Sequence, residues 1–413
     1  GTRSDSRRSG APTTASRRSV LRATGGTVGS AGLLSTVGDA GTAAARTAEQ
    51  RRNGWAVDLP RRVRAMTRNL GLGARLYGFV DTDTRRVDPR QVYERYRQVR
   101  ESAPAERMRA IAAGIADDLP AVVGLQEVAR VQRGPNDYTG GSTPNAEREV
   151  YDFLTLLTDG LARELERYDF DVGYRVAATS RNLDEEFPAE APGGERFDVR
   201  LTDRDVVLVR DDLATRQTDT GNYALNVSAV LQDGTRVTVT RGYALAGIAL
   251  EGAPFTFVTT HLAVASDVVR EAQAAELAAV VEQREGPVVV AGDLNTTPTG
   301  DRSAAYERLV EGRLRDVWAA TTDDPGPTCC QGELLRNDRS RLGIRVDMIM
   351  TAGPVMPLAA WRTDTEPGDR ITVTTPDGEA RLWPSDHAGV VADVRVEPRS
   401  RNPLAALRGL LFG

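Results

Sequence analysis

The sequence predicts a layered α/β fold, in which two β-sheets pack against each other and helices cover their outer faces. Many short apolar runs, rich in β-branched residues, alternate with polar turns along most of the 413-residue chain and indicate strands. Helical spacing of apolar residues is confined to a few long stretches, which is typical of crossovers between strands. The hydrophobic fraction of 40% is ordinary for a protein with a full core.

The composition excludes several functions. All 53 basic residues are arginines, so chemistry that needs a lysine, such as a Schiff base, is excluded. The net charge of -5 argues against a non-specific coat on nucleic acid, but not against a local basic groove. No apolar run reaches the roughly 18 residues of a membrane-spanning helix. The two cysteines, Cys329 and Cys330, are adjacent, and we expect free thiols there, with a strained vicinal bridge in an oxidising compartment as the alternative.

Residues 1–45 are predicted to be a disordered twin-arginine export signal, with a linker over residues 46–61. The first segment is rich in Ser, Gly, Ala, Thr and Arg and cannot bury a core. The pair Arg17 and Arg18 precedes a weakly apolar run, and small residues at 42–45 suit a cleavage site. A disordered Arg-rich tail is the alternative. On the export interpretation, the chain uses the twin-arginine machinery and is extracellular or located at the cell surface.

The globular domain is predicted to span residues 62–397, followed by a C-terminal tail over 398–413. A first strand covers residues 63–70. A helix over residues 106–119 then leads into a second buried strand over 121–128, and Pro120 ends the helix.

Further strands and helices follow in alternation. We predict strands over 174–178, 205–209, 223–231, 235–241, 243–250, 254–260, 288–291, 346–350 and 390–396. We predict helices over 150–165, 267–284 and 303–310. The dipeptide Asp233-Gly234 is a strong hairpin signal. Long polar segments are expected to be loops, the first with a short helix, over 74–104, 130–146, 180–200 and 363–381.

Polar residues of only four types, Asn, Glu, Asp and His, end or interrupt these apolar strands. The run from Val288 stops at Gly292 and is followed by Asp293 and Asn295. Residues i and i+2 of an extended segment point to the same side, so both side chains are expected to reach one spot. The others are Asn69, Glu127, His261, Asp347, Asp386 and His387. Since rigid strand ends commonly carry catalytic groups, this pattern predicts one active site.

These residue types suit metal-assisted hydrolysis of a phosphate ester. A hard cation such as Mg²⁺ takes oxygen ligands, and Glu127 can supply one. Asp293 can orient or deprotonate the attacking water, and Asn295 can donate a hydrogen bond to a phosphoryl oxygen. Histidines can stabilise the pentacovalent state, and neighbouring carboxylates would raise their pKa and favour the charged form.

The ordered set of motifs resembles the endonuclease/exonuclease/phosphatase superfamily, the DNase I-like group of Mg²⁺-dependent phosphoesterases. The six motifs are Met66 to Asn69, Gly124 to Glu127, Thr260 to Leu262, Gly292 to Asn295, Val346 to Ile349 and Ser385 to His387. They occur in the order of the family and span residues 63–396. The resemblance implies a four-layered DNase I-like sandwich with two central, mostly antiparallel β-sheets flanked by helices.

The resemblance also implies a metal site. Glu127 resembles the main ligand of the metal, and Asn69 resembles a neighbour that contacts the metal or the phosphate. Asp386 resembles a carboxylate close to the metal. The implied ion is Mg²⁺, with Mn²⁺ and Ca²⁺ as alternatives.

Catalytic roles follow from the same resemblance. Asp293 resembles the residue that positions the attacking water, and Asn295 resembles its phosphate-binding partner. His261 resembles the histidine that donates to the phosphate or to the leaving group, oriented by a carboxylate such as Asp347. His387 resembles a terminal histidine at the reaction centre.

The predicted function is that of an exported Mg²⁺-dependent phosphoesterase that hydrolyses phosphodiester bonds by in-line attack of water. Its substrate is DNA or RNA, or a phospholipid head group. Arginines such as Arg68 and Arg75 can flank a nucleic-acid cleft, whereas Trp361 and Trp383 can form a lipid-facing rim. The alternatives are a phosphomonoesterase of sugar or inositol phosphates, and a non-catalytic binding protein of the same fold. We expect a monomer with no obligate protein partner.

Overall fold

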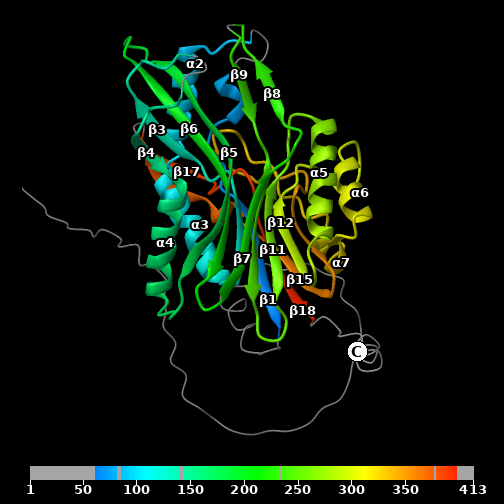
Figure 1. Cartoon of the computed structure of the whole chain (residues 1–413). Coiled ribbons are helices and arrows are strands. Elements are labelled where there is room, and N and C mark those ends of the chain that lie inside the picture. Colours follow the sequence, from blue (N-terminus) through cyan, green and yellow to red (C-terminus); the bar gives the residue numbers. More distant parts are fainter. Residues whose placement is uncertain (1–60, 81–84, 140–142, 233, 376–377, 398–413) are drawn as a thin grey trace, which may run out of the picture. The chain divides into compact units, whose positions relative to one another are not determined.

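The computed structural model describes residues 61–80, 85–139, 143–232, 234–375 and 378–397 (Figure 1). They form the layered α/β sandwich that the sequence predicts. The predicted export signal, the linker up to residue 60 and the C-terminal tail lie outside the described residues.

The first sheet has eight strands in the order β15-β18-β1-β2-β6-β3-β4, with β5 also paired to β6. Its strands are β1 (Arg62–Asn69), β2 (Val122–Gln126), β3 (Arg130–Gly134), β4 (Arg148–Asp152), β5 (Tyr174–Glu190), β6 (Arg196–Arg210), β15 (Val355–Thr363) and β18 (Gly389–Val396). The pair β1 and β2 is parallel, and the other strand pairs of this sheet are antiparallel.

The second sheet has six strands in the order β13-β14-β12-β11-β10-β7. They are β7 (Ala214–Asn222), β10 (Gly242–Ala249), β11 (Phe255–His261), β12 (Val288–Asp293), β13 (Arg315–Asp316) and β14 (Asp347–Ala352). Only the pair β11 and β12 is parallel among these described strands, so both sheets are mostly antiparallel. Two small hairpins complete the described strands, β8 (Val227–Val230) with β9 (Arg236–Val239) and β16 (Ile371–Thr375) with β17 (Gly378–Leu382).

Helices cover both outer faces (Figure 1). The described helices on these faces are η1 (Leu76–Phe79), α2 (Pro89–Glu101), α3 (Pro104–Asp118), α4 (Phe153–Arg167), α5 (Asp267–Glu282) and α6 (Ala304–Glu311). The short helix α7 (Val317–Thr321) packs at the core between the sheets, and η2 (Pro367–Asp369) buries no side chain. The side chain of Asp152 caps α4 by accepting a hydrogen bond from the Leu154 backbone N–H, which fixes where this helix begins. In the described part of the chain, none of the helices has the length and apolar character needed to cross a membrane.

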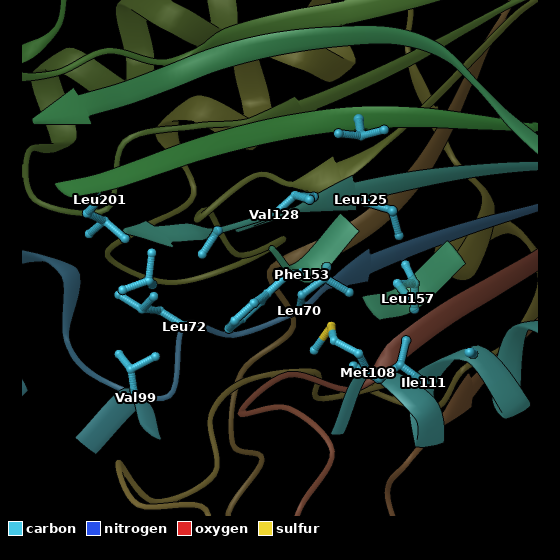
Figure 2. Packing of buried hydrophobic residues seen from close by; sticks show 14 of the residues in the cluster. Leu70, Leu72, Val99, Met108, Ile111, Leu125, Val128, Phe153, Leu157 and Leu201 are labelled. Atoms are coloured by element: carbon cyan, nitrogen blue, oxygen red, sulfur yellow. The ribbon is translucent and has the colours of Figure 1, made fainter. Parts of the chain in front are cut away.

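Three cores separate the four layers. Under α2, α3 and α4, residues such as Met108, Ile111, Phe153 and Leu157 pack against the first sheet (Figure 2). A second core lies between the sheets, and a third lies under α5 and α6. The core between the sheets contains many small residues. At Gly124, an added Cβ atom would lie only 2.6 Å from Thr259 Oγ1, so a glycine is required for this close approach.

Several polar segments form regular structure where we predicted loops. Residues 180–200 belong largely to the long hairpin of β5 and β6, because charged residues pair across its exposed surface: Arg200 Nε donates to Asp184 Oδ1 over 2.7 Å. The segment 74–104 contains η1 and the 13-residue helix α2. The segments 130–146 and 363–381 contain β3 and the hairpin of β16 and β17, respectively. The strands β7 and β15 were also not predicted.

Candidate active site

The predicted site residues meet where strands of both sheets end. Asn69 ends β1 and Glu127 follows β2 in the first sheet. In the second sheet, His261 ends β11, Asp293 ends β12, and Asp347 begins the antiparallel neighbour β14. Because β1 runs parallel to β2, β11 runs parallel to β12 and β14 runs in the opposite direction, these positions share one end of their sheets.

Asn69 connects the two sheets. Its Nδ2 atom donates to Asp293 Oδ2 over 3.1 Å and to Glu127 Oε1 over 3.2 Å. Its own oxygen accepts a hydrogen bond of 2.9 Å from the backbone N–H of Gly71. The backbone N–H of Leu72 donates to the second oxygen of Glu127 over 2.9 Å. The amide therefore orients both carboxylates toward the same space.

His387 pairs with Asp347, so the prediction that Asp347 orients His261 is wrong. His387 Nδ1 lies 2.8 Å from Asp347 Oδ2, and its Nε2 atom lies 3.9 Å from Asp293 Oδ2. The segment that precedes β18 brings His387 to the start of β14. Burial opposes the charged imidazolium, but the carboxylates of Asp347 and Asp293 hold the pKa of His387 well above its ordinary value.

His261 has a different environment. Asn295 Nδ2 lies 3.1 Å from His261 Nε2 and also donates to the carbonyl oxygen of Leu262 over 3.0 Å. His261 Nε2 also lies 3.4 Å from Asp293 Oδ2, and the buried Nδ1 atom has no hydrogen-bond partner among the described residues. Burial, together with the charge of Arg241, holds the pKa of His261 well below its ordinary value. The prediction that neighbouring carboxylates raise the pKa of the histidines is therefore correct for His387 and wrong for His261.

The backbone adopts left-handed conformations at three positions of the site. Glu127 has φ of 52°, Asn295 has φ of 48° and Gly71 has φ of 64°. Asn295 is therefore not on an extended segment as predicted, although both it and Asp293 still contact His261. A Cβ atom at Gly71 would lie 2.4 Å from Asp386 Oδ1, so only glycine allows the chain to pass this carboxylate. Unfavourable backbone conformations of this kind are typical of functional sites.

A cleft of about 540 Å³ opens above these residues. Its walls include Glu127, His261, Asp293, Asn295, Asp386 and His387 from the predicted set. Three arginines also line it, Arg75, Arg241 and Arg302. Arg241 donates to Asp203 Oδ2 over 3.0 Å, and Arg302 donates to the carbonyl oxygen of Asn295 over 2.9 Å. Arg241 and Arg302 were not predicted as site residues, because arginines are scattered through the whole chain and give no local signal.

Cys329 and Cys330 form a vicinal disulfide at the cleft, so the expectation of free thiols is wrong. The surrounding backbone holds this segment in place: the N–H of Cys329 donates to the carbonyl oxygen of Ile344 over 3.0 Å, and Cys329 also forms a β-bridge with His387. The hydroxyl oxygen of Thr328 accepts from the N–H of Asp347 over 3.0 Å. This segment therefore supports both members of the pair formed by His387 and Asp347.

The carboxylates fit a hard divalent cation. Burial, and then the charge of Asp386, raises the pKa of Glu127 to about 7. Burial, and then the charge of Asp347, raises the pKa of Asp293 to about 6. A bound cation would relieve the repulsion that these values reflect. Ligand atoms of Asp293, Asp347 and His387 lie within 4.8 Å of one another, but a protonated His387 offers no lone pair, so the oxygens of this group are the candidate ligands; the buried Asp347 Oδ1 has no hydrogen-bond partner. Oxygen donors of this kind suit Mg²⁺, Mn²⁺ or Ca²⁺.

Two residues considered for substrate contact lie elsewhere. Trp383 is fully buried in a small core beside the hairpin of β16 and β17, so it cannot form a lipid-facing rim. Arg68 is also fully buried and pairs with Asp364 over 2.6 Å, so it cannot flank a nucleic-acid cleft. Trp361 is partly buried, with the guanidinium of Arg64 4.7 Å from its ring centre. Arg75 does line the cleft.

A two-sheet sandwich that gathers acidic, amide and imidazole side chains at its strand ends defines the DNase I-like class of hydrolytic phosphoesterases. The chain belongs to the endonuclease/exonuclease/phosphatase family, whose sequence model matches residues 76–387. This match confirms the superfamily that the motifs predict. Members of the family are generally phosphoesterases and typically depend on a divalent metal.

One solved structure of the same family shares the fold, and two others are also similar to this chain. One from Bacteroides thetaiotaomicron is 14% identical, with a TM-score of 0.52, over 82% of this chain and 99% of that chain. One from Bacteroides vulgatus is 17% identical, with a TM-score of 0.46, over 81% and 99% of the two chains. A mannosyl-6-phosphatase of Bacteroides thetaiotaomicron is 14% identical, with a TM-score of 0.49, over 80% and 99%. A search of curated proteins finds no match.

Proposed function

We propose that the protein is an exported, Mg²⁺-dependent phosphoesterase that hydrolyses phosphodiester bonds by in-line attack of water. The observation that carries this proposal is the hydrogen bond of 3.1 Å from Asn69 to Asp293, which brings the Glu127 side of the cleft to the His387 side. Glu127 and Asp386 would hold the metal, with Asn69 beside them. When bound, the metal supplies charge neutralisation at the phosphate and lowers the pKa of a bound water.

Side chains of the protein supply the remaining catalytic and positioning roles. Asp293, whose pKa lies at about 6, is suited to orient the attacking water and to accept its proton near neutral pH. His387 stays protonated beside Asp347 and can donate to a phosphoryl oxygen or to the leaving group. Both donor contacts of Asn295 are directed to His261 and to the Leu262 carbonyl oxygen, so Asn295 positions His261. Arg302 adds positive charge to the cleft for the phosphate.

Hydrolysis of bis-p-nitrophenyl phosphate tests this function. Glu127→Ala and His387→Ala should each lower kcat/KM at least about 100-fold in the presence of Mg²⁺. Glu147→Ala is the matched control, because Glu147 is exposed and lies outside the cleft. Wild-type rates in both cleft variants would show that the site is wrong, and activity that survives EDTA would exclude the metal. Release of phosphate from inositol phosphates without diester cleavage would instead favour the phosphomonoesterase alternative.

Export is proposed from the sequence of residues 1–45, and a reporter fusion tests it. The fused reporter should leave the cytoplasm, and replacement of Arg17 and Arg18 by lysine should retain it there. Size-exclusion chromatography should show a monomer.

A further inference from the structure

A second, apolar cavity lies beside the catalytic cleft. Its volume is about 220 Å³. Its walls come from η1, β5 and the small hairpin of β8 and β9, and the exposed Ala265 closes one side. The apolar side chains that line it include Phe79, Val80, Leu183, Phe187, Val227 and Val237. Among all its lining residues, Ser228 carries the only polar side chain, and none is charged.

We infer that this cavity binds the hydrocarbon part of an amphiphilic phosphodiester, so that the substrate is a phospholipid. This inference rests on the proposed phosphodiesterase function and narrows its substrate class. An apolar cavity of this kind favours burial of methylene groups, since each buried methylene contributes to binding through the hydrophobic effect.

The cavity is rigidly built on its inner side. The rings of Phe79 and Phe187 are almost completely buried and pack with their centres 5.6 Å apart. The hairpin of β8 and β9, seen at one end of the domain in Figure 1, forms the other wall. Its outer residues Val227 and Ala229 are half-buried. The cavity therefore has an ordered apolar floor and a side open to solvent, as entry of a chain requires.

Three chain segments each contribute residues both to this cavity and to the catalytic cleft. Val264 lines the cleft and its neighbour Ala265 lines the cavity. Arg75 lines the cleft just before η1, which carries Phe79. Arg241 follows the cavity residue Val239 by two positions. Because consecutive Cα atoms are only about 3.8 Å apart, the two spaces adjoin.

The polar cleft and the apolar cavity beside it together match an amphiphile, which has a charged head and an apolar chain. The cleft offers arginines, histidines and a metal site for a phosphate head, and the adjoining cavity offers only apolar walls and one hydroxyl. A nucleic acid would place further phosphates and polar bases beside the scissile ester, and these would need charged or hydrogen-bonding walls. A sugar phosphate would likewise leave its hydroxyl groups unpaired in the cavity.

A homologous series of substrates tests the inference on the full chain. The probes are methyl, butyl and octyl p-nitrophenyl phosphate, used as monomers in Mg²⁺. In the wild type, kcat/KM should rise with chain length, by up to about fourfold for each methylene that the cavity buries. A flat profile across the three esters would overturn the inference.

Two variants assign the effect to this cavity. Ala265→Asp places a charge at its exposed side and should reduce the ratio of octyl to methyl kcat/KM at least tenfold. Ala275→Asp, at an exposed position of α5 outside both spaces, should keep the wild-type ratio. An undiminished ratio in Ala265→Asp would overturn the inference even if the wild type prefers the octyl ester. Ala229→Asp on the opposite wall provides a second variant with the same expectation.

The same assay separates this inference from the proposed function. If no ester is hydrolysed in the presence of a divalent metal, the phosphodiesterase function itself fails. If the methyl ester is hydrolysed and chain length has no effect, only the apolar subsite fails. Cleavage of plasmid DNA with a higher kcat/KM than the octyl ester, unchanged in Ala265→Asp, would also overturn the lipid assignment.

Discussion

Asn69 Nδ2 lies 3.1 Å from Asp293 Oδ2, and this hydrogen bond joins the end of β1 in one sheet to the end of β12 in the other. Both residues are almost fully buried. The same Nδ2 atom also donates to Glu127, so one amide group orients a carboxylate from each sheet. The positions of these two carboxylates therefore depend on the packing of the sheets as well as on each strand.

Asn69→Asp should lower kcat/KM about 100-fold, because it replaces a shared donor by a third carboxylate. The steady-state rate with bis-p-nitrophenyl phosphate measures this loss. Asn222→Asp, at an exposed position of β7, is the matched control and should retain the wild-type rate. A rate within threefold of the wild type in Asn69→Asp would contradict the bridging role.

Asp347→Asn should shift the pH profile of kcat/KM toward acid on its alkaline side. Asp347 helps to raise the pKa of His387, so its neutralisation lets the imidazolium lose its proton at a lower pH. The stabilisation from this pair is present below pH about 6.5 and is lost as pH rises through the higher folded-state pKa. The variant should therefore lose most stability at low pH. Asp323→Asn, at an exposed position, is the control and should keep the wild-type pH profile. An alkaline limb that is unchanged in Asp347→Asn would contradict the pairing of Asp347 with His387.

The metal-free protein should become less stable as pH rises from 4.5 to about 7. The folded state raises the pKa of Glu127 from 4.5 to about 7, so it binds this proton more tightly than the unfolded chain does. The loss should be on the order of 1–3 kcal/mol, measured by urea unfolding in EDTA. Glu127→Gln should reduce the pH dependence, whereas exposed Glu147→Gln should keep it. Mg²⁺ should restore stability at pH 8 in the wild type, and equal stability with Mg²⁺ and EDTA would argue against the metal site.

Arg107→Leu should destabilise the fold by about 3 kcal/mol and also lower activity. Arg107 is fully buried on α3 and donates to the carbonyl oxygens of Leu70, Gly71 and Pro384, which belong to the segments that carry Asn69 and Asp386. Its loss would leave these oxygens without partners. Arg109→Leu on the exposed face of the same helix should change the free energy of unfolding by less than about 0.5 kcal/mol. Urea denaturation of both variants compares them directly.

The strand ends were predictable because buried strands and the polar residues that end them are local features. The apolar run from Val288 identifies β12, and Asp293, predicted to follow the strand, is its last residue in the structure. The start of β5 and the end of β6 were predicted as strands, but the part of this hairpin within residues 180–200 was missed for a related reason. Its polar residues, such as Asp184 and Arg200, pair with each other across the strands, and this pairing is not visible in a single segment.

The roles of the two histidines required the structure. Asp347 is far from both His261 and His387 along the chain, and no local pattern shows which of the two it contacts. The pKa of His261 falls because of its burial and the charge of Arg241, and neither can be read from the sequence around position 261. Pairings between distant segments are set by tertiary packing, which residue type and spacing do not encode.

The glycine at position 124 has a consequence for how such a sequence can change over time. A side chain there would force β2 away from Thr259 on β11 and widen the gap between the sheets. Because Asn69 and Asp293 sit on opposite sides of that gap, even a small widening would lengthen the contact between them and slow turnover. Substitutions on the inner faces are therefore constrained by turnover rate as well as by stability. A substitution on an inner face should consequently be tolerated mainly when a second substitution restores the spacing between the sheets.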